Sequence, residues 1–182
     1  TQINASGSGV TYASGGESES IVYNKLEIPR GGEFCLTLSD GTRVWLNSET
    51  SIQYPVAFGA KERRVFVQGE AYFEVAKDAK KPFTVQFMSS SVTVLGTSFN
   101  IRAYPEEKQS QATLAEGSVR IYSPGSSMLL KPGEQAEVNA LSGEMVKREV
   151  EVKSFTSWKD GRFVFEQQPL EDIMRTLERW YD

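Results

Sequence analysis

The sequence contains no histidine, a single cysteine and no apolar run longer than three residues. Without histidine it cannot build a Ser-His or Cys-His catalytic pair or a histidine-containing metal site. A single cysteine cannot form an internal disulfide, so Cys35 is interpreted as a small buried hydrophobic residue. The short apolar runs exclude a transmembrane helix and a signal-peptide core within these residues.

A strong charge of either sign is also missing, because the net charge of the chain is only −4. This value gives no electrostatic reason to expect nucleic acid or an anionic membrane as a partner. The apolar fraction of 39% and the length of 182 residues are typical of a globular chain that buries a core without metals or disulfides. Because the chain begins with Thr1 rather than Met, we expect it to be part of a longer protein.

Three segments differ in composition. Residues 1–20 are rich in Ser, Gly, Thr and Asn, which predicts a flexible linker. Residues 21–157 contain many short alternating apolar segments and predict an all-β domain. Residues 158–182 predict the start of a C-terminal α+β domain, in which a strand at Phe163–Phe165 precedes a helix.

We expect the β domain to be a mostly antiparallel sandwich of two sheets. A short β-solenoid-like winding is the alternative. It rests on the similarity between Thr37–Thr42 and Thr113–Ser118, which could reflect stacked turns.

Residues 33–47 predict a β-hairpin whose register follows from residue types. A three-residue loop, Ser39-Asp40-Gly41, ends on a glycine that can adopt the left-handed conformation. This loop pairs Leu36 with Val44 and Phe34 with Leu46. One face then carries Phe34, Leu36, Leu38, Val44 and Leu46, and the other carries Cys35, Thr37, Arg43 and Trp45. A two-residue turn would mix the two faces, so the three-residue loop is predicted.

The last part of the sequence has helical rather than strand periodicity. Pro169 suits the first turn of a helix. Glu171 and Asp172 also lie in this turn, where the helix dipole stabilises negative charge. The apolar residues that share one helical stripe are Leu170, Ile173, Met174, Leu177, Trp180 and Tyr181. These six are our candidates for protein interaction. Because no further strand follows to cover them, we also expect self-association through this helix.

No catalytic, cofactor or metal site is predicted. Glu70 and Glu74 share a strand face, but four residues of strand separate them by about 13 Å. This distance exceeds the separation of the carboxylate pairs in glycosidases. The basic residues Lys61, Arg63 and Arg64 are interpreted as a solvated loop rather than an anion site. The chain is therefore predicted not to be an enzyme.

A carbohydrate-binding or adhesive β domain is the alternative function. It would use aromatic side chains as a stacking platform. This hypothesis requires Trp45, Tyr54 or Tyr72 to be exposed together on one flat face.

Several ordered motifs resemble the FecR family of transmembrane anti-sigma regulators. In the β domain they are Leu36–Asn47, Gly69–Val75, Pro82-Phe83, Val94–Asn100, Leu114–Val119 and Lys131–Ala136. The start of the family's C-terminal domain is resembled by Trp158–Gly161, Pro169-Leu170 and Arg179–Tyr181. The resemblance covers roughly residues 25–182, and the motifs are specific as an ordered set.

The resemblance implies a periplasmic signal-transduction module tethered to the inner membrane. In this family a cytoplasmic region binds an extracytoplasmic-function sigma factor, and one membrane helix follows that region. The periplasmic part senses the signalling domain of a TonB-dependent outer-membrane receptor, with help from the C-terminal domain. The cytoplasmic region and the membrane helix are expected to precede Thr1.

Overall fold

The computed structural model describes residues 3–6, 9–12, 22–165 and 169–181, and its strands form two sheets. In neighbour order, sheet A contains β1 (Ile3–Ser6), β2 (Gly9–Tyr12), β4 (Phe34–Thr37), β5 (Arg43–Leu46), β7 (Arg63–Glu74), β10 (Ser98–Ala103), β11 (Gln109–Glu116), β14 (Glu134–Asn139) and β15 (Met145–Glu149). Sheet B contains β3 (Tyr23–Glu27), β6 (Ser51–Pro55), β7, β8 (Phe83–Phe87), β9 (Ser90–Val94), β12 (Val119–Ser123) and β13 (Ser126–Leu130). The pairings of these strands are antiparallel except β2–β4 and β7–β8.

Strand β7 belongs to both sheets and changes sheet at Gly69. Its first half pairs with β6 and β8, and its second half pairs with β5 and β10. Gly69 has φ of 106°, and a Cβ atom there would lie 2.5 Å from Oγ1 of Thr50. Only glycine fits this corner, because both the conformation and the space exclude a side chain.

The two sheets enclose one hydrophobic core, as the sandwich prediction requires. Fully buried residues of sheet A, such as Leu36, Phe73 and Phe99, belong to the same cluster as Phe83 and Ile121 of sheet B. The all-β prediction is confirmed. The similarity between Thr37–Thr42 and Thr113–Ser118 does not reflect equivalent turns, because the first closes a hairpin and the second connects β11 of sheet A to β12 of sheet B.

The hairpin β4–β5 has the predicted register. Phe34 pairs with Leu46 and Leu36 with Val44, and Gly41 in the loop has φ of 85°. The carboxylate of Asp40 accepts hydrogen bonds from the backbone and hydroxyl of Thr42 and from the Arg63 guanidinium. The interpretation of Arg63 as a loop residue in solvent is wrong. Its side chain is buried, and it ties the hairpin turn to the start of β7.

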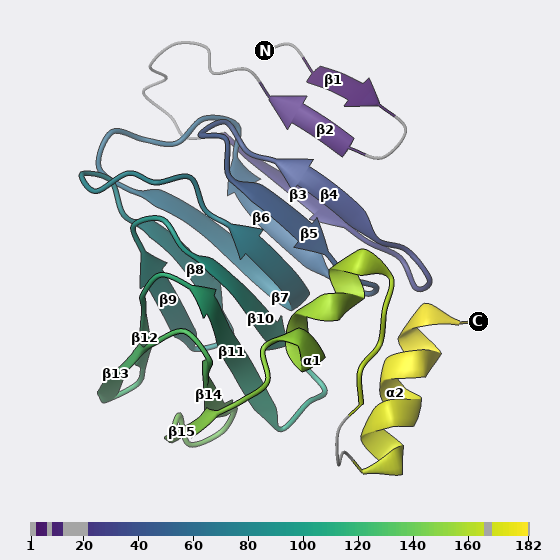
Figure 1. Ribbon diagram of the computed structural model, residues 1–182. Helices are drawn as coiled ribbons and strands as arrows, with labels where there is room; N and C mark the ends of the chain where they lie inside the picture. The colour runs from purple at the N-terminus through teal and green to yellow at the C-terminus, as the bar shows by residue number, and fades with distance from the viewer. Residues whose placement is uncertain (1–2, 7–8, 13–21, 166–168, 182) are drawn as a thin grey trace.

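Three short helical elements follow the β strands, and Figure 1 shows α1 in front of sheet A with α2 beside it. They are α1 (Lys153–Thr156), the 3₁₀ helix η1 (Ser157–Asp160) and α2 (Leu170–Trp180). The predicted helix is therefore present, but Phe163–Phe165 does not form the predicted strand. No strand in the described part of the chain pairs with these residues, and Phe163 instead packs edge-on against Trp180 of α2, with ring centroids 4.6 Å apart.

Part of the segment that was expected to be a linker is in strands. β1 and β2 form an antiparallel pair within residues 1–20, and β2 pairs in parallel with β4. The remaining residues of this segment lie outside the described ranges.

Candidate functional site

The outer face of sheet A and the C-terminal segment enclose a cleft of about 1180 Å³. Strands β10, β11, β14 and β15 form one wall, and α1, η1, residues 162–165 and α2 form the other. Most of the lining side chains are charged or amide, because they alternate with the core residues along each strand. The cleft is therefore a polar space between the β domain and the C-terminal unit.

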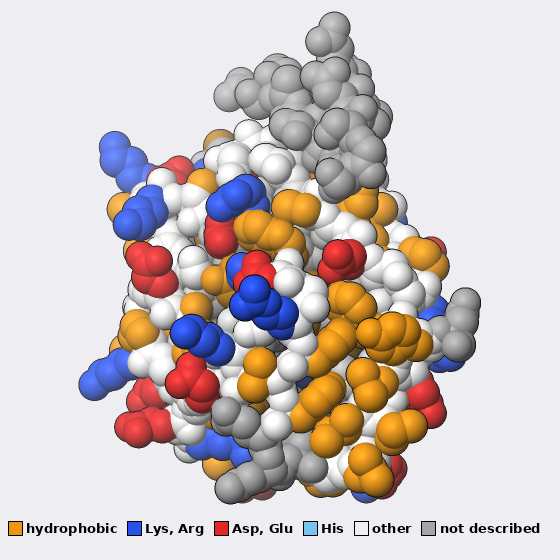
Figure 2. Space-filling model, turned by 45° about the vertical axis from the view of Figure 1, so that its right-hand side comes forward, with side chains coloured by type: hydrophobic (Ala, Val, Ile, Leu, Met, Phe, Trp, Pro, Cys, Tyr) orange, Lys and Arg blue, Asp and Glu red, His pale blue; other side chains and the backbone are white. Residues whose placement is uncertain are grey.

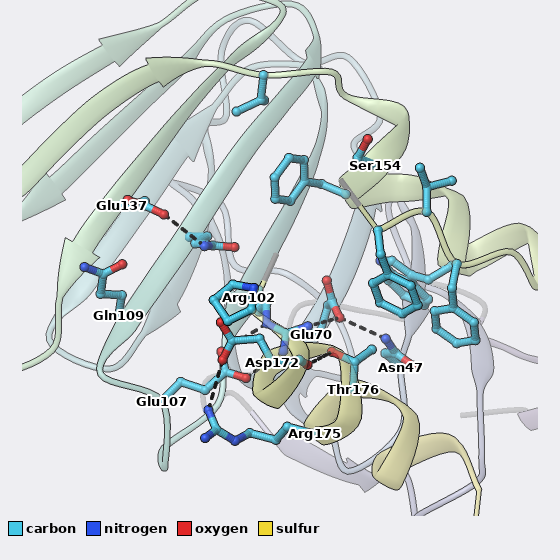
Figure 3. A pocket seen from close by; sticks show the side chains of 18 of the residues that line it. Asn47, Glu70, Arg102, Glu107, Gln109, Glu137, Ser154, Asp172, Arg175 and Thr176 are labelled. Atoms are coloured by element: carbon cyan, nitrogen blue, oxygen red, sulfur yellow. Dashed lines mark hydrogen bonds and ion pairs between the residues drawn. The ribbon is translucent and has the colours of Figure 1, made fainter. Parts of the chain in front are cut away.

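Glu70 lies at the inner end of this cleft and is only 5% exposed. Its carboxylate accepts hydrogen bonds from the side-chain amides of Asn47 at 2.9 Å and Asn100 at 3.0 Å, and it pairs with Arg102 at 3.3 Å. Figure 3 shows Glu70 between Arg102 and Asn47. A buried carboxylate is stable only when its charge is paired and its oxygens are hydrogen-bonded, and these three donors meet that requirement.

Arg102 continues this network toward the loop between β10 and β11. Its guanidinium donates to both carboxylate oxygens of Glu107, at 2.7 and 3.0 Å, in the two-pronged geometry that arginine favours. Burial by itself lowers the pKa of Arg102, but Glu70 and Glu107 outweigh it and hold the pKa above its ordinary value. Arg102 therefore remains charged and bridges the two carboxylates.

Arg179 of α2 is buried at the same end of the sandwich. Its guanidinium pairs with Glu106, with Glu107 at 3.1 Å and with Glu49 at 3.6 Å, and its carbon lies 3.7 Å from the ring centroid of Tyr104. Only 4% of this arginine is exposed. Burial raises the pKa of Tyr104, and Glu70 adds to the shift, so the ring stays neutral beneath the cation. This contact places the C-terminal end of α2 on the β domain.

A second contact attaches η1 to sheet A. The indole of Trp158 donates a hydrogen bond to Oδ1 of Asn100 at 3.1 Å, and Trp158 is buried. The ammonium of Lys159 lies 5.7 Å above the ring of Trp45 and 5.3 Å above the ring of Tyr72. The C-terminal segment therefore covers the aromatic side chains of this face.

The carbohydrate-binding alternative does not meet its own requirement. Tyr54 is 3% exposed in the core, and Tyr72 is 6% exposed on the other side of sheet A. Trp45 packs edge-on against Tyr72 with centroids 5.8 Å apart and is half-buried. These rings do not form one exposed flat platform.

The six predicted interaction residues divide into two groups. Leu170, Met174 and Tyr181 are 72%, 49% and 66% exposed, whereas Ile173, Leu177 and Trp180 are half-buried. Figure 2 shows apolar side chains gathered on the face that carries the C-terminal segment. Exposed Val164 belongs to the same segment.

Several residues that organise the site carried no recognisable signal in the sequence. Asn100, Arg102 and Arg179 are each one polar residue among many, and each has a partner that lies 30 to 73 residues away. Glu70 was expected to share a strand face with Glu74, but nothing in the sequence indicated that a later segment would bury it. Among the described residues no group of three or more acidic or cysteine side chains is placed to hold a metal ion. None of the described helices is long and apolar enough to span a membrane.

Comparisons with known proteins identify the family. The model of the FecR protein family matches residues 24–120, and that of the FecR C-terminal family matches residues 162–182. No significant match exists among curated proteins. Two crystal structures, each of a "putative anti-sigma factor" from Parabacteroides distasonis ATCC 8503, superpose with TM-scores of 0.83. The 2.50 Å structure is 36% identical over 88% of this chain and 75% of its own, and the 1.65 Å structure is 37% identical over 87% and 74%. Together with the two-sheet fold and the C-terminal segment docked on it, these matches show that the chain belongs to the FecR family of anti-sigma regulators, a regulatory and non-enzymatic kind of protein.

Proposed function

We propose that this chain is the periplasmic signalling part of a membrane-anchored anti-sigma regulator. In this role it relays the state of a TonB-dependent outer-membrane transducer to an extracytoplasmic-function sigma factor. The sigma factor is bound by a cytoplasmic region, which a membrane helix joins to this chain, and both lie N-terminal to Thr1 in the whole protein. Membership of the FecR family supports this assignment.

The contact with the transducer's signalling domain is assigned to the exposed face of α2. The observation that carries it is the division of this helix into two sides. Arg179 is buried against the β domain, whereas Leu170, Met174 and Tyr181 point their apolar surface into solvent. Exposed apolar side chains gathered on one face are typical of a protein-interaction site.

A binding experiment with a surface variant tests this proposal. The double variant Leu170→Glu/Met174→Glu is titrated with the signalling domain of the transducer that is encoded beside this chain. We expect its Kd to be at least about tenfold weaker, because two apolar side chains at the contact are replaced by charges. Leu141→Glu is the matched control, since Leu141 is 99% exposed in the turn between β14 and β15. Equal binding by the double variant, or no binding by the wild type, would contradict the assignment.

We also propose that the same face supports self-association of this chain. Light scattering at increasing protein concentration should show a species larger than the monomer for the wild type. The double variant should remain monomeric over the same range. A wild-type chain that stays monomeric throughout would exclude self-association through α2.

A further inference from the structure

The geometry points to a guanidinium-binding site on the β domain, formed by Glu49, Glu106, Glu107 and Tyr104, that holds α2 through Arg179 and can release it. We call these four residues the arginine cup. The inference deepens the proposed function, because it names the contact that would couple the partner-binding helix to the β sandwich. The cup itself can be tested without any partner.

Two loops at one end of the sandwich build the cup. Glu49 lies between β5 and β6 in a left-handed conformation with φ of 57°, and Glu106 and Glu107 lie between β10 and β11. Tyr104 forms the floor, and its hydroxyl donates to the carbonyl of Ser48 at 2.9 Å. The two loops are therefore joined by a contact that does not involve Arg179, which makes the cup a feature of the β domain rather than of the helix.

The chemistry of the cup matches a guanidinium group. The edge of Arg179 meets carboxylates through Nε and Nη2, while its plane lies on the ring of Tyr104. A planar cation with several donors fits this combination better than an ammonium group, which is a compact point charge. The backbone adds one contact, a hydrogen bond of 2.9 Å from the amide of Gly31 to the carbonyl of Arg179.

The apolar residues of α2 are not packed against the core of the β domain: Ile173, Leu177 and Trp180 are half-buried but lie outside the core cluster, and Trp180 packs against Phe163 of the C-terminal segment. Leu170 and Met174 are exposed, and the first turns of the helix meet the polar cleft through Asp172, Arg175 and Thr176, as Figure 3 shows. The docking therefore depends mainly on charge. Because the cost of desolvating buried charges cancels most of the gain from their attraction, such a contact contributes only a small net stability. The Nη1 atom of Arg179 is buried without a hydrogen-bond partner, which reduces that net stability further.

The cup is also connected to the other anchor of the C-terminal unit. Glu107 accepts from both Arg179 and Arg102, and Arg102 pairs with Glu70. Glu70 accepts from Asn100, which in turn accepts from Trp158 of η1. Release of Arg179 therefore frees a carboxylate that Arg102 shares, and it changes the charge balance along the chain of contacts that ends at Trp158. A partner that pulls α2 from the cup would act on the β sandwich through this network.

Hydrogen exchange of the free protein tests the cup. In Arg179→Ala we expect the backbone amides of α2 to exchange about tenfold faster, while amides of β8 and β9, which contain none of the residues in this network, are unchanged. Arg175→Ala is the matched control, since Arg175 lies on the same helix and pairs only with Glu171 and Asp172 in the described contacts. Arg179→Lys should give intermediate protection.

Binding of ethylguanidinium, a small ion that carries the head group of arginine, tests directly whether the cup recognises a guanidinium. Added to Arg179→Ala at millimolar concentration, the ion should occupy the vacated cup, and its binding should be lost in Arg179→Ala/Glu107→Gln. Unchanged α2 exchange in Arg179→Ala, or ethylguanidinium binding that does not depend on Glu107, would overturn the inference. Should Arg179→Ala not fold, Glu106→Gln replaces it in the exchange measurement, because Glu106 is about half exposed and the change removes one carboxylate of the cup. Failure of the transducer to bind would contradict the proposed function and leave these results unaffected.

Discussion

The indole N–H of Trp158 and the side-chain oxygen of Asn100 form a hydrogen bond of 3.1 Å that joins the C-terminal segment to the centre of sheet A. The amide N–H of the same side chain donates a hydrogen bond to Glu70, so both the oxygen and the nitrogen of Asn100 are hydrogen-bonded. Its orientation is thereby fixed, with the oxygen directed at the indole and the nitrogen at the carboxylate. The C-terminal segment is attached by a specific polar geometry and not by apolar contact alone.

Replacing Trp158 with phenylalanine should therefore destabilise the protein. Trp158→Phe keeps an aromatic ring but leaves the buried oxygen of Asn100 without a donor, which costs about 1–3 kcal/mol. The free energy of unfolding, measured by urea titration, checks this value. Trp45→Phe is the control, because Trp45 is only half-buried, and it should cost less. Equal stability of Trp158→Phe and the wild type would show that the hydrogen bond is unimportant.

The sheet-changing corner at Gly69 predicts a large effect of a single methyl group. In Gly69→Ala the new Cβ would lie 2.5 Å from Oγ1 and 2.7 Å from Cα of Thr50, at φ of 106°. We expect a loss of more than about 3 kcal/mol, or a failure to fold, because the neighbouring backbone must move.

Gly41→Ala separates the effect of conformation from that of space. Gly41 also has positive φ, at 85°, but nothing lies within 4 Å of the added atom. Its cost should be only about 1–2 kcal/mol, from the left-handed backbone alone. If thermal unfolding shows the two variants to be equally destabilised, the close approach to Thr50 is not what selects glycine at position 69.

Glu70→Gln tests whether the centre of the cleft requires a negative charge. The new NH2 group would face either Asn100 or the pair Asn47 and Arg102, all of which are themselves donors, and Arg102 would have one carboxylate fewer. Breaking a buried pair in this way costs about 3–5 kcal/mol. Glu74→Gln, four residues along the same face, alters a surface pair with Arg43 and should cost less than about 1 kcal/mol. Chemical denaturation of both variants compares them, and similar losses would contradict the structural role of Glu70.

The β domain was largely predictable because its information is local. Alternating residues in each strand and the Ser39-Asp40-Gly41 loop were enough to place Leu36 opposite Val44, since a shift of one residue exposes the core face. The helical periodicity of the apolar residues, which is also a local pattern, located α2. The alternation at Phe163–Phe165 predicted a strand wrongly, because alternation shows only that a segment could form a strand and not that a partner strand is present.

The candidate site was much less predictable because it depends on long-range contacts. Arg63 was interpreted as a residue of a solvated loop, yet it pairs with Asp40, 23 positions earlier. Arg179 reaches Glu106 across 73 positions. A charged residue in a sequence gives no indication of which distant carboxylate will accompany it into the interior. The periodicity of α2 identified its apolar stripe, but the residue that docks the helix on the β domain is Arg179, which lies outside that stripe.

The pKa of Glu106 predicts that the docking of α2 weakens in acid. Burial alone would raise the pKa of this carboxyl, but the hydrogen bond and charge of Arg179, a backbone hydrogen bond and the charge of Arg102 together outweigh it and hold the pKa below its ordinary value of 4.5. A group whose pKa is lower in the folded state contributes stability above its unfolded-state pKa and loses it as the pH falls through the folded-state value. The exchange rate of α2 amides, corrected for the intrinsic effect of pH, should therefore rise below pH 4.5. In Glu106→Gln this rise should be smaller, because the titrating group is gone while Glu49 and Glu107 remain. An identical pH dependence in both proteins would mean that protonation of Glu106 does not control the docking of the helix.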